Sequence, residues 1–459
     1  MSSIPHSGPD SAPSPAQFNA LGRQFEGLGK VDQAMEAYRG ALLLDPTFRP
    51  AAANLGRILV ALDRPREAVA LLEPLAVVAP DDIALVINYA NALLEIGRPA
   101  EAEQYLRAVM KTGTVPAQAQ NSLGIARYIQ RDFAGARDAF SAATNADSSF
   151  AEAHENLAQA LLHLGDYETA WFENEWRWRN PSNHLTKRIF AEPLWNGQPL
   201  NGRTLLLHGE QGYGDTIQFA RYASLIDKGN GGRIVLACQE ALAPILATVP
   251  GVDSVYALGD PLPAFDCQAP ILNVRRAMET RIETVPDLTP YIHAEPDAEI
   301  AKQSGFKIGI VWCGRARHVD DPYRNRTCPP QCFAMLADIP DVKLFSLQLG
   351  RPTDESVAAQ AIDLSPRIVN FADTARLVAA MDAVVTIDTA LAHLAGALAK
   401  PCWVLPPYTA DWRWTPRPDG MQPWYPKTRA VPQPSPGDWM SAFARVAREL
   451  AQNLVDRIP

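Results

Sequence analysis

The residues that could carry chemistry gather in three loops of the second half of the chain, and the first of these loops reads GEQGYGD. Its glycines, Gly209, Gly212 and Gly214, predict positive φ angles and a backbone that a ligand can approach closely. Asp215 ends the loop at the start of an expected helix. Its carboxylate could cap that helix, or it could act as a general base in a cleft.

The second loop follows a buried apolar run and reads DTALAH, from Asp388 to His393. The first-turn amides of Thr389, Ala390 and Leu391, beside the Thr389 hydroxyl, predict a diphosphate site that needs no basic residue. His393 lies one turn beyond Thr389 and could face the same ligand. The alternative is that Asp388 caps the helix and that His393 packs in the core.

The third loop, residues 314–327, concentrates cations in an otherwise acidic protein. It begins at Gly314, after an expected strand, and its basic side chains are Arg315, Arg317, His318, Arg324 and Arg326. Several cations on one loop suit a phosphorylated or anionic ligand. A solvated loop is the alternative.

Short apolar runs that alternate with helical patterns must position these loops. The expected strands are 203–208, 234–238, 253–257, 269–273, 307–312, 343–347, 367–370, 383–387 and 401–405. They form two successive sets, which predict two doubly wound lobes at 195–295 and 300–459 with a cleft between them. Ligands of such sheets bind beyond the carboxyl ends of the strands, where all three loops stand.

The first half repeats itself every 34 residues. The aligned positions are Gly29, Asp63, Gly97, Arg131 and Gly165, followed at the same step by Ala34, Ala68, Ala102, Ala136 and Ala170. Each unit predicts two helices, in which a small residue such as Gly22 lets the pair approach and a large one such as Tyr38 fills the space between. Aromatic residues crowd the last unit and should dock it on the second half of the chain: Trp171, Phe172, Trp176 and Trp178.

Composition excludes several functions for the 459 residues. The net charge of -9, with no block of Lys and Arg, argues against a nucleic-acid partner. We expect no membrane span, because the longest apolar stretches are shorter than about 18 residues. Residues 1–14 predict a disordered lead and no secretory signal. The six cysteines lack the spacing of a zinc site, so we expect reduced thiols, no metal and a cytoplasmic protein.

The 34-residue unit, with its L-G…A-x3-F…P pattern, resembles the tetratricopeptide repeat over residues 15–180. The tryptophan often found early in that repeat is absent. The resemblance implies an α-solenoid of five repeats whose concave groove binds a peptide or a partner protein. A passive spacer or a dimerisation surface is the alternative.

Residues 195–445 resemble the heptosyltransferase-like GT-B glycosyltransferases, glycosyltransferase family nine. GYGD at 212–215 and DTALAHLAGAL at 388–398 carry the resemblance. A subgroup with repeats in front also shows HGEQGYGDTIQFAR, GRARH…NRT and DWRW…WYP, all present here. The resemblance implies a GT-B fold of two Rossmann-like lobes, with the acceptor on the first lobe and the nucleotide-sugar on the second.

This family transfers sugar with inversion from a nucleotide-diphosphate donor without a bound metal. The resemblance therefore implies Asp215 as the base, with His208 as the alternative. It implies a donor site at Asp388, Thr389, Ala390, Leu391 and His393, to which the basic loop would add Gly314, Arg324 and Arg326. The family often has glycine where Ala390 stands, so a Cβ lies near the expected phosphate.

Repeats fused to a GT-B half resemble the architecture of O-GlcNAc transferase, which makes a protein acceptor the favoured expectation. The alternatives are a catalytically inactive scaffold whose repeats bind other proteins, and a core-oligosaccharide transferase without protein acceptors. The sugar, the nucleotide and the acceptor residue are not encoded in any pattern of this sequence.

Overall fold

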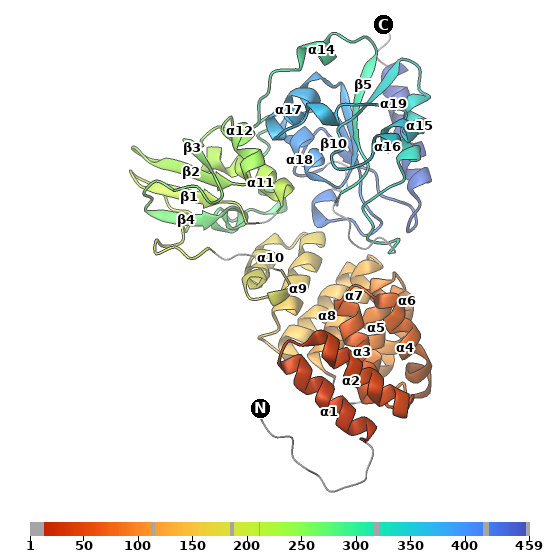
Figure 1. Cartoon of the computed structure of the whole chain (residues 1–459). Coiled ribbons are helices and arrows are strands. Elements are labelled where there is room, and N and C mark those ends of the chain that lie inside the picture. Colours follow the sequence, from red (N-terminus) through yellow and green to blue (C-terminus); the bar gives the residue numbers. More distant parts are fainter. Residues whose placement is uncertain are drawn as a thin grey trace. The chain divides into compact units, whose positions relative to one another are not determined.

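The computed structural model describes residues 13–111, 113, 115–183, 188–210, 212–314, 321–415 and 422–455. The chain divides into two compact units, Met1–Ala153 and His154–Pro459 (Figure 1). Residues 1–12, which make up most of the predicted disordered lead, lie outside the described part.

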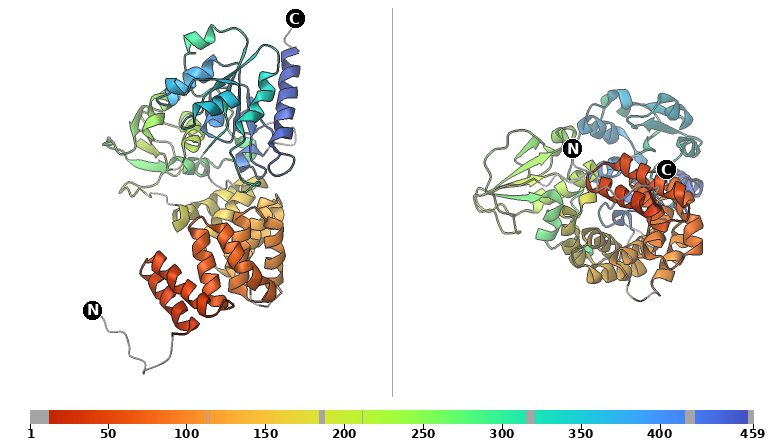
Figure 2. Two further views of the ribbon diagram at one scale, coloured as in Figure 1. Left: turned by 45° about the vertical axis from the view of Figure 1, so that its right-hand side comes forward. Right: turned by 60° about the horizontal axis from the view of Figure 1, so that its bottom comes forward.

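The first unit consists of consecutive helices that pair along the chain and stack pair upon pair (Figure 2). The helices are α1 (Pro15–Gly27), α2 (Val31–Leu44), α3 (Arg49–Ala61), α4 (Pro65–Val78), α5 (Ile83–Glu95), α6 (Pro99–Val109), α7 (Ala117–Ile129) and α8 (Phe133–Ala146). This arrangement confirms the predicted helical solenoid.

Small residues permit the close helix pairs that the repeat predicts. A Cβ built on Gly22 of α1 would lie 2.5 Å from Cε1 of Tyr38 in α2. On Gly124 of α7 it would lie 2.4 Å from Cε1 of Phe140 in α8. Because real Cβ contacts are never this short, a larger residue would force the paired helices apart.

The turn inside each helix pair also follows the 34-residue step. All five aligned positions have a left-handed backbone: Gly29 (φ 70°), Asp63 (59°), Gly97 (74°), Arg131 (65°) and Gly165 (83°). Glycine favours this conformation and aspartate tolerates it better than most residues do. The repeat in the sequence therefore marks the points where the first helix of each pair ends.

The second unit begins within α9 (Ala151–His163), which α10 (Tyr167–Glu173) and the 3-10 helices η1 (Asn174–Trp178) and η2 (Pro181–Asn183) follow. The helix pair that ends the 34-residue pattern is thus part of the second unit. Of the aromatic residues expected to dock it, Trp171 is buried and its Nε1 donates to the Thr280 carbonyl at 2.8 Å. Phe172 remains 56% exposed.

The first lobe holds a parallel four-stranded sheet in the order β3-β2-β1-β4. The strands are β1 (Thr204–His208), β2 (Arg233–Cys238), β3 (Ser254–Ala257) and β4 (Cys267–Pro270). The helices are α11 (Tyr213–Ala220), η3 (Arg221–Leu225), η4 (Glu240–Leu242), α12 (Ala243–Leu246), η5 (Ile271–Asn273), α13 (Val274–Ala277) and η6 (Ile282–Thr284). Helix α14 (Ala298–Ala301) follows them and packs against the second lobe. Strand β1 lies inside the sheet, in register with β2 at Leu206↔Val235.

The second lobe holds a parallel six-stranded sheet in the order β10-β9-β8-β5-β6-β7. The strands are β5 (Phe306–Val311), β6 (Val342–Ser346), β7 (Ala361–Asp363), β8 (Ala383–Ile387), β9 (Cys402–Leu405) and β10 (Thr428–Ala430). The helices are η7 (Pro330–Phe333), α15 (Ala334–Ala337), α16 (Thr353–Ala358), η8 (Ser365–Arg367), α17 (Phe371–Ala380), α18 (Ala390–Ala397), η9 (Trp412–Trp414) and α19 (Trp439–Val455). Helix α19 (Figure 2) buries Phe443, Val446 and Leu450 against this sheet.

Two parallel sheets flanked by helices confirm the two predicted Rossmann-like lobes. Two of the strands expected from the sequence, 367–370 and 269–273, have the wrong residue ranges. Residues 367–370 are not a strand, since β7 lies earlier, at Ala361–Asp363. The physical reason is Asn370, whose side-chain oxygen accepts from the amides of Ala372 and Asp373 and so caps α17. In the first lobe, the run expected at 269–273 leaves strand β4 after Pro270 and turns into η5.

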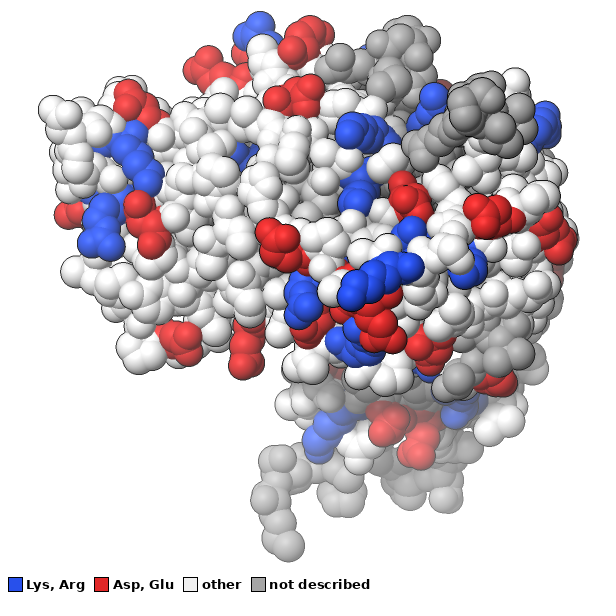
Figure 3. Space-filling model, turned by 90° about the horizontal axis from the view of Figure 1, so that it is seen from above, with Lys and Arg blue, Asp and Glu red and all other residues white. Residues whose placement is uncertain are grey.

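Charged side chains are spread over the face of the molecule seen in Figure 3, where acidic and basic groups alternate and form no block of one sign. Within the described residues, no helix combines the length and the apolar character that a membrane crossing requires. All six cysteines are free thiols.

Candidate functional site

A cavity of about 980 Å³ opens within the second unit, where the carboxyl ends of the strands in both lobes face it. The first lobe contributes the start of α11 and residues after β4. The second lobe contributes the segments after β5, β6, β7 and β8 together with the segment at 411–413. The lining includes Gly212, Gly214, Asp215, Gly314, Arg326, Asp388, Thr389, Ala390, Leu391 and His393. The structure thus brings most of the predicted site residues together.

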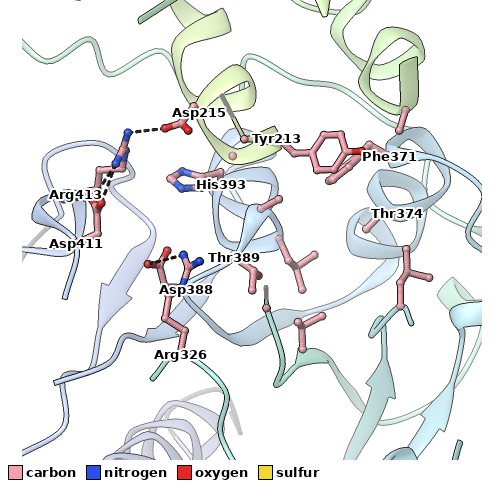
Figure 4. A pocket seen from close by; sticks show the side chains of 18 of the residues that line it. Tyr213, Asp215, Arg326, Phe371, Thr374, Asp388, Thr389, His393, Asp411 and Arg413 are labelled. Atoms are coloured by element: carbon pink, nitrogen blue, oxygen red, sulfur yellow. Dashed lines mark hydrogen bonds and ion pairs between the residues drawn. The ribbon is translucent and has the colours of Figure 1, made fainter. Parts of the chain in front are cut away.

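The loop after β1 positions Asp215 in the first turn of α11. Gly212 is the N-cap residue, with φ −66° and ψ 166°, so the capping alternative for Asp215 was wrong. None of Gly209, Gly212 and Gly214 has a positive φ angle, and the chain enters the helix through extended backbone at Gly212. The Asp215 carboxylate points instead toward Arg413 (Figure 4), whose Nη2 lies 2.5 Å from Oδ1.

Arg413 joins the two lobes at the cavity, and sequence reasoning missed it. Its Nη1 donates to both carboxylate oxygens of Asp411 at 3.0 Å, and its Nε donates to Oε1 of Gln218 at 2.7 Å. Burial opposes the charge of Asp411, yet Arg413 lowers the pKa of that carboxyl below its usual value. The DWRW motif, which contains Arg413, was the signal in the sequence that could have found it.

The turn between β8 and α18 forms the opposite side of the cavity. Thr389 is the N-cap residue of α18, with φ −142° and ψ 174°, so the prediction that Asp388 caps the helix was wrong. The Thr389 hydroxyl lies 3.3 Å from the hydroxyl of Thr386. Ala390 and Leu391 begin the helix, where amides have no partner within the helix, and both line the cavity.

Asp388 leaves the end of β8 and turns toward Arg326 (Figure 4), with 3.6 Å between Oδ2 and Nη1 of the arginine. Burial raises the pKa of Asp388, although Arg326 acts in the opposite direction. Gly314 lies close by, since a Cβ on it would stand 3.5 Å from Cγ2 of Thr389. The basic loop therefore reaches the β8–α18 turn through Arg326.

His393 is buried, as expected for a histidine packed in the core. It also lines the cavity, as expected for a residue that faces a ligand. Its Nδ1 lies 3.0 Å from the Tyr425 hydroxyl. Burial lowers the pKa of His393 to about 3, so the imidazole is neutral at pH 7. A Cβ on Gly214 would lie 2.6 Å from its Cδ2, so this glycine lets α11 approach α18.

Two of the predicted site residues do not line the cavity. His208 is buried beside Phe190, its Nε2 lies 3.0 Å from Oε1 of Gln268, and burial lowers its pKa to about 4. Arg324 forms an ion pair with the fully buried Asp321. The predictions for Arg315, Arg317 and His318 lie outside the described residues.

Other lining residues gave no recognisable signal in the sequence. The rings of Tyr213 in α11 and Phe371 in α17 lie 5.1 Å apart at the far end of the cavity (Figure 4). Asn370 and Thr374 line the same end. Because these side chains come from helix termini of both lobes, only the packed structure places them together.

The comparisons with known proteins agree with this architecture. Residues 27–86 and 121–173 match models of the tetratricopeptide repeat, and residues 351–429 match glycosyltransferase family 9 (heptosyltransferase). Protein FlbA of Caulobacter vibrioides is 26% identical over 497 residues, which span 93% of this chain and 82% of that protein.

Solved structures also resemble part of the chain. The crystal structure of MamA is 20% identical, covers 35% of this chain and 93% of its own, and has a TM-score of 0.30. TTC0263, a thermophilic TPR protein of Thermus thermophilus, is 18% identical, covers 37% of this chain and 93% of its own, and has a TM-score of 0.33.

The chain thus combines a tetratricopeptide-repeat region with a region of the glycosyltransferase family 9 type. The matched family segment contains β8, Asp388, Thr389, His393 and Arg413. The match supports a glycosyltransferase for the second unit at the level of the family.

Proposed function

We propose that the second unit is a metal-independent, inverting glycosyltransferase that moves a sugar from a nucleotide-diphosphate donor to a protein recruited by the repeats. One observation carries the proposal. The Asp215 carboxylate and the start of α18 line the same cavity from opposite lobes. A donor bound at α18 would therefore present its sugar toward a base held on α11.

The start of α18 suits the donor diphosphate. The amides of Ala390 and Leu391 and the Thr389 hydroxyl can donate to phosphate oxygens, and the helix dipole favours negative charge there. Arg326 adds a positive charge whose side chain is 40% exposed and therefore free to shift onto a ligand. These groups would compensate the leaving diphosphate without a metal ion.

The neighbouring side chains suit the sugar and its bond to phosphate. Because His393 is neutral, it would donate one N–H to the donor rather than contribute a charge. Asp388 would repel a phosphate when ionised, so we assign it to sugar hydroxyls, which can donate to its oxygens. Its contact with Arg326 keeps the carboxylate next to the diphosphate site.

Asp215 would act as the base. Its carboxylate would take the proton of the acceptor hydroxyl while that oxygen forms a bond to the anomeric carbon. The bond between that carbon and the donor phosphate oxygen breaks, and its electron pair leaves with the nucleoside diphosphate. Attack from the side opposite to the leaving group inverts the anomeric configuration.

The repeats would supply the acceptor, since such arrays bind peptides and partner proteins along their helices. The six free thiols favour a reducing compartment, which suits the cytoplasm. A scaffold without activity would share the fold but would have no use for a donor site.

The experiment is a thermal-shift measurement of the full chain with UDP, GDP, TDP, ADP and CMP. We expect one nucleotide to raise the melting temperature of the wild type, and Arg326→Gln, which removes the positive charge assigned to the diphosphate, to reduce that shift. Arg429→Gln, at a 59% exposed arginine that does not line the cavity, is the matched control. A wild type that no nucleotide stabilises would overturn the transferase and favour the scaffold.

A further inference from the structure

The cavity has a second polar wall that the donor site does not use. It consists of residues from the last helix pair and from the segment after β4: Glu155, Gln159, Leu162, Asn174, Leu272 and Arg275. Asp215 of α11 lines the same cavity as this wall and the start of α18. An acceptor held against the wall would therefore share the cavity with the proposed base.

A buried ion pair fixes this wall to the first lobe. Arg177 of η1 is 1% exposed, and its Nη2 donates to both carboxylate oxygens of Glu210 at 3.0 and 2.9 Å. The same nitrogen contacts Oδ1 of Asn273 at 2.5 Å. Because an ion pair at this depth is costly to separate, the last helix pair is a permanent part of the catalytic unit.

Arg275 is the buried cation of this wall. It is 3% exposed and packs between aromatic rings, with its guanidinium carbon 4.2 Å from the centre of Trp171 and 4.9 Å from that of Phe219. Its Nη2 donates a hydrogen bond to Oδ1 of Asn174 at 2.7 Å. Among the described residues, no carboxylate lies within ion-pair distance of Arg275, although its neighbours Arg177 and Arg413 each have two.

A buried cation without a carboxylate partner is energetically unfavourable. Burial, with the positive charges of Arg413 and Arg177 close by, lowers the pKa of Arg275 to about 9. An anion brought into contact with this guanidinium would relieve that cost. The guanidinium has five N–H donors in a planar fork, and a carboxylate can accept two of them at once.

We propose that Arg275 is the recognition site for a carboxylate of the acceptor polypeptide, an Asp or Glu side chain next to the residue that receives the sugar. The inference rests on the proposed function and specifies its acceptor. A polypeptide fits because one side of the wall is a helix of the repeat pattern, and because Gln159 carries an amide that can pair with a peptide backbone. Arg275 would bind and orient the acceptor, while Asp215 takes the proton.

The charged and titratable groups around Arg275 are Tyr167 in α10, Arg177 in η1, Glu210, Asp215 in α11, Tyr222 in η3 and Arg413. Burial raises the pKa values of both Tyr167 and Tyr222 to about 12. Both phenols are therefore uncharged at neutral pH, so neither supplies an anion to Arg275.

The test uses the full chain and two fluorescent eight-residue peptides that differ only in Asp-Ser-Asp against Asn-Ser-Asn at their centre. Binding is measured by fluorescence anisotropy with a saturating concentration of the nucleotide found by thermal shift. We expect the acidic peptide to bind the wild type about tenfold more tightly, as for a hydrogen bond between charged groups. Arg275→Gln should remove this preference.

Arg276→Gln is the matched control, since Arg276 neighbours Arg275 on α13 but lies against Phe172 and does not line the cavity. It should keep the preference for the acidic peptide. In the wild type, which needs no substitution, free acetate should compete with the acidic peptide and weaken its binding more than that of the Asn-Ser-Asn peptide. This measurement keeps the test valid even if Arg275→Gln does not fold.

Three results would overturn the inference: equal or absent binding of both peptides by the wild type, an equal loss in Arg276→Gln, or weaker nucleotide binding in Arg275→Gln. The last result would assign Arg275 to the donor phosphate. A wild type that binds nucleotide but shows no acidic preference refutes only this inference. A wild type that binds no nucleotide refutes the proposed function itself.

Discussion

The Nη2 atom of Arg413 lies 2.5 Å from Oδ1 of Asp215, although the two residues are 198 positions apart in the chain. Arg413 also donates two hydrogen bonds from Nη1 to Asp411, which fix its guanidinium within the second lobe. From there the guanidinium binds the Asp215 carboxylate of the first lobe. The side chain of the proposed base is thereby oriented by the lobe to which we assign the donor. This relationship leads to the first prediction.

Arg413→Lys should lower kcat about 100-fold while the dissociation constant of the nucleotide stays unchanged. A lysine keeps the charge but cannot hold Asp215, Asp411 and Gln218 at once, so the carboxylate of Asp215 loses its orientation. Steady-state kinetics measures the change in kcat, and a separate titration measures the dissociation constant of the nucleotide. Arg429→Lys, at a 59% exposed arginine, is the control. A loss of nucleotide binding in Arg413→Lys would show that Arg413 serves the donor site instead.

Asp215→Asn should reduce sugar transfer by about 10² to 10⁴, because an amide cannot accept the acceptor proton. The substitution keeps the shape of the side chain, and nucleotide binding should persist. His208→Gln should have little effect, since His208 faces Gln268 in the first lobe and does not line the cavity. Transfer rates of both variants decide between the two bases. Full activity in Asp215→Asn would remove Asp215 from the mechanism.

Gly214→Ala should destabilise the second unit by about 1–3 kcal/mol, as overpacking does. The added Cβ would stand 2.6 Å from Cδ2 of His393, so α11 and α18 would have to separate. Gly212→Ala is the control, because its Cβ would meet only Oδ2 of Asp215 at 3.6 Å. Urea denaturation followed by tryptophan fluorescence reports on the second unit, where all ten tryptophans lie.

Combining Gly214→Ala with His393→Ala should recover part of the loss, since the second substitution removes the ring that the first one meets. If the two losses simply add, the contact between Gly214 and His393 does not limit the approach of the helices.

The second unit should lose stability as the pH falls below about 6.5. His393 has a pKa of about 3 in the folded protein and takes up a proton near pH 6.5 when unfolded. The unfolded state therefore binds more protons in this interval, and the free energy of unfolding falls by up to about 1.4 kcal/mol per pH unit. His208, with a pKa of about 4, acts in the same direction.

Urea denaturation at pH 7 and pH 5 measures this dependence. His393→Gln should show a smaller difference between the two pH values than the wild type, because glutamine does not titrate. An unchanged difference would mean that His393 is not buried as a neutral base.

Much of this protein is determined by local patterns in its sequence. The 34-residue step predicts the helix pairs, since both the close contact of Gly22 with Tyr38 and the left-handed turn at Gly29 recur at that step. Asp388 and His393 are positioned by one strand–turn–helix segment, so their common site follows from short-range geometry. The same reasoning found Asp215 but left open whether it caps α11 or faces the cavity, and the structure excludes the cap.

Tertiary structure alone decided which distant residues meet. Arg413 pairs with Asp215, and Arg275 packs against Trp171, across separations that no periodicity encodes. The 34-residue pattern groups the last helix pair with the repeats, whereas the structure groups it with the second unit. Arg177, in the 3-10 helix that follows this pair, forms an ion pair with Glu210 of the first lobe. Periodicity records which face of an element is apolar, but the partner of a buried charge is chosen only when two elements pack together.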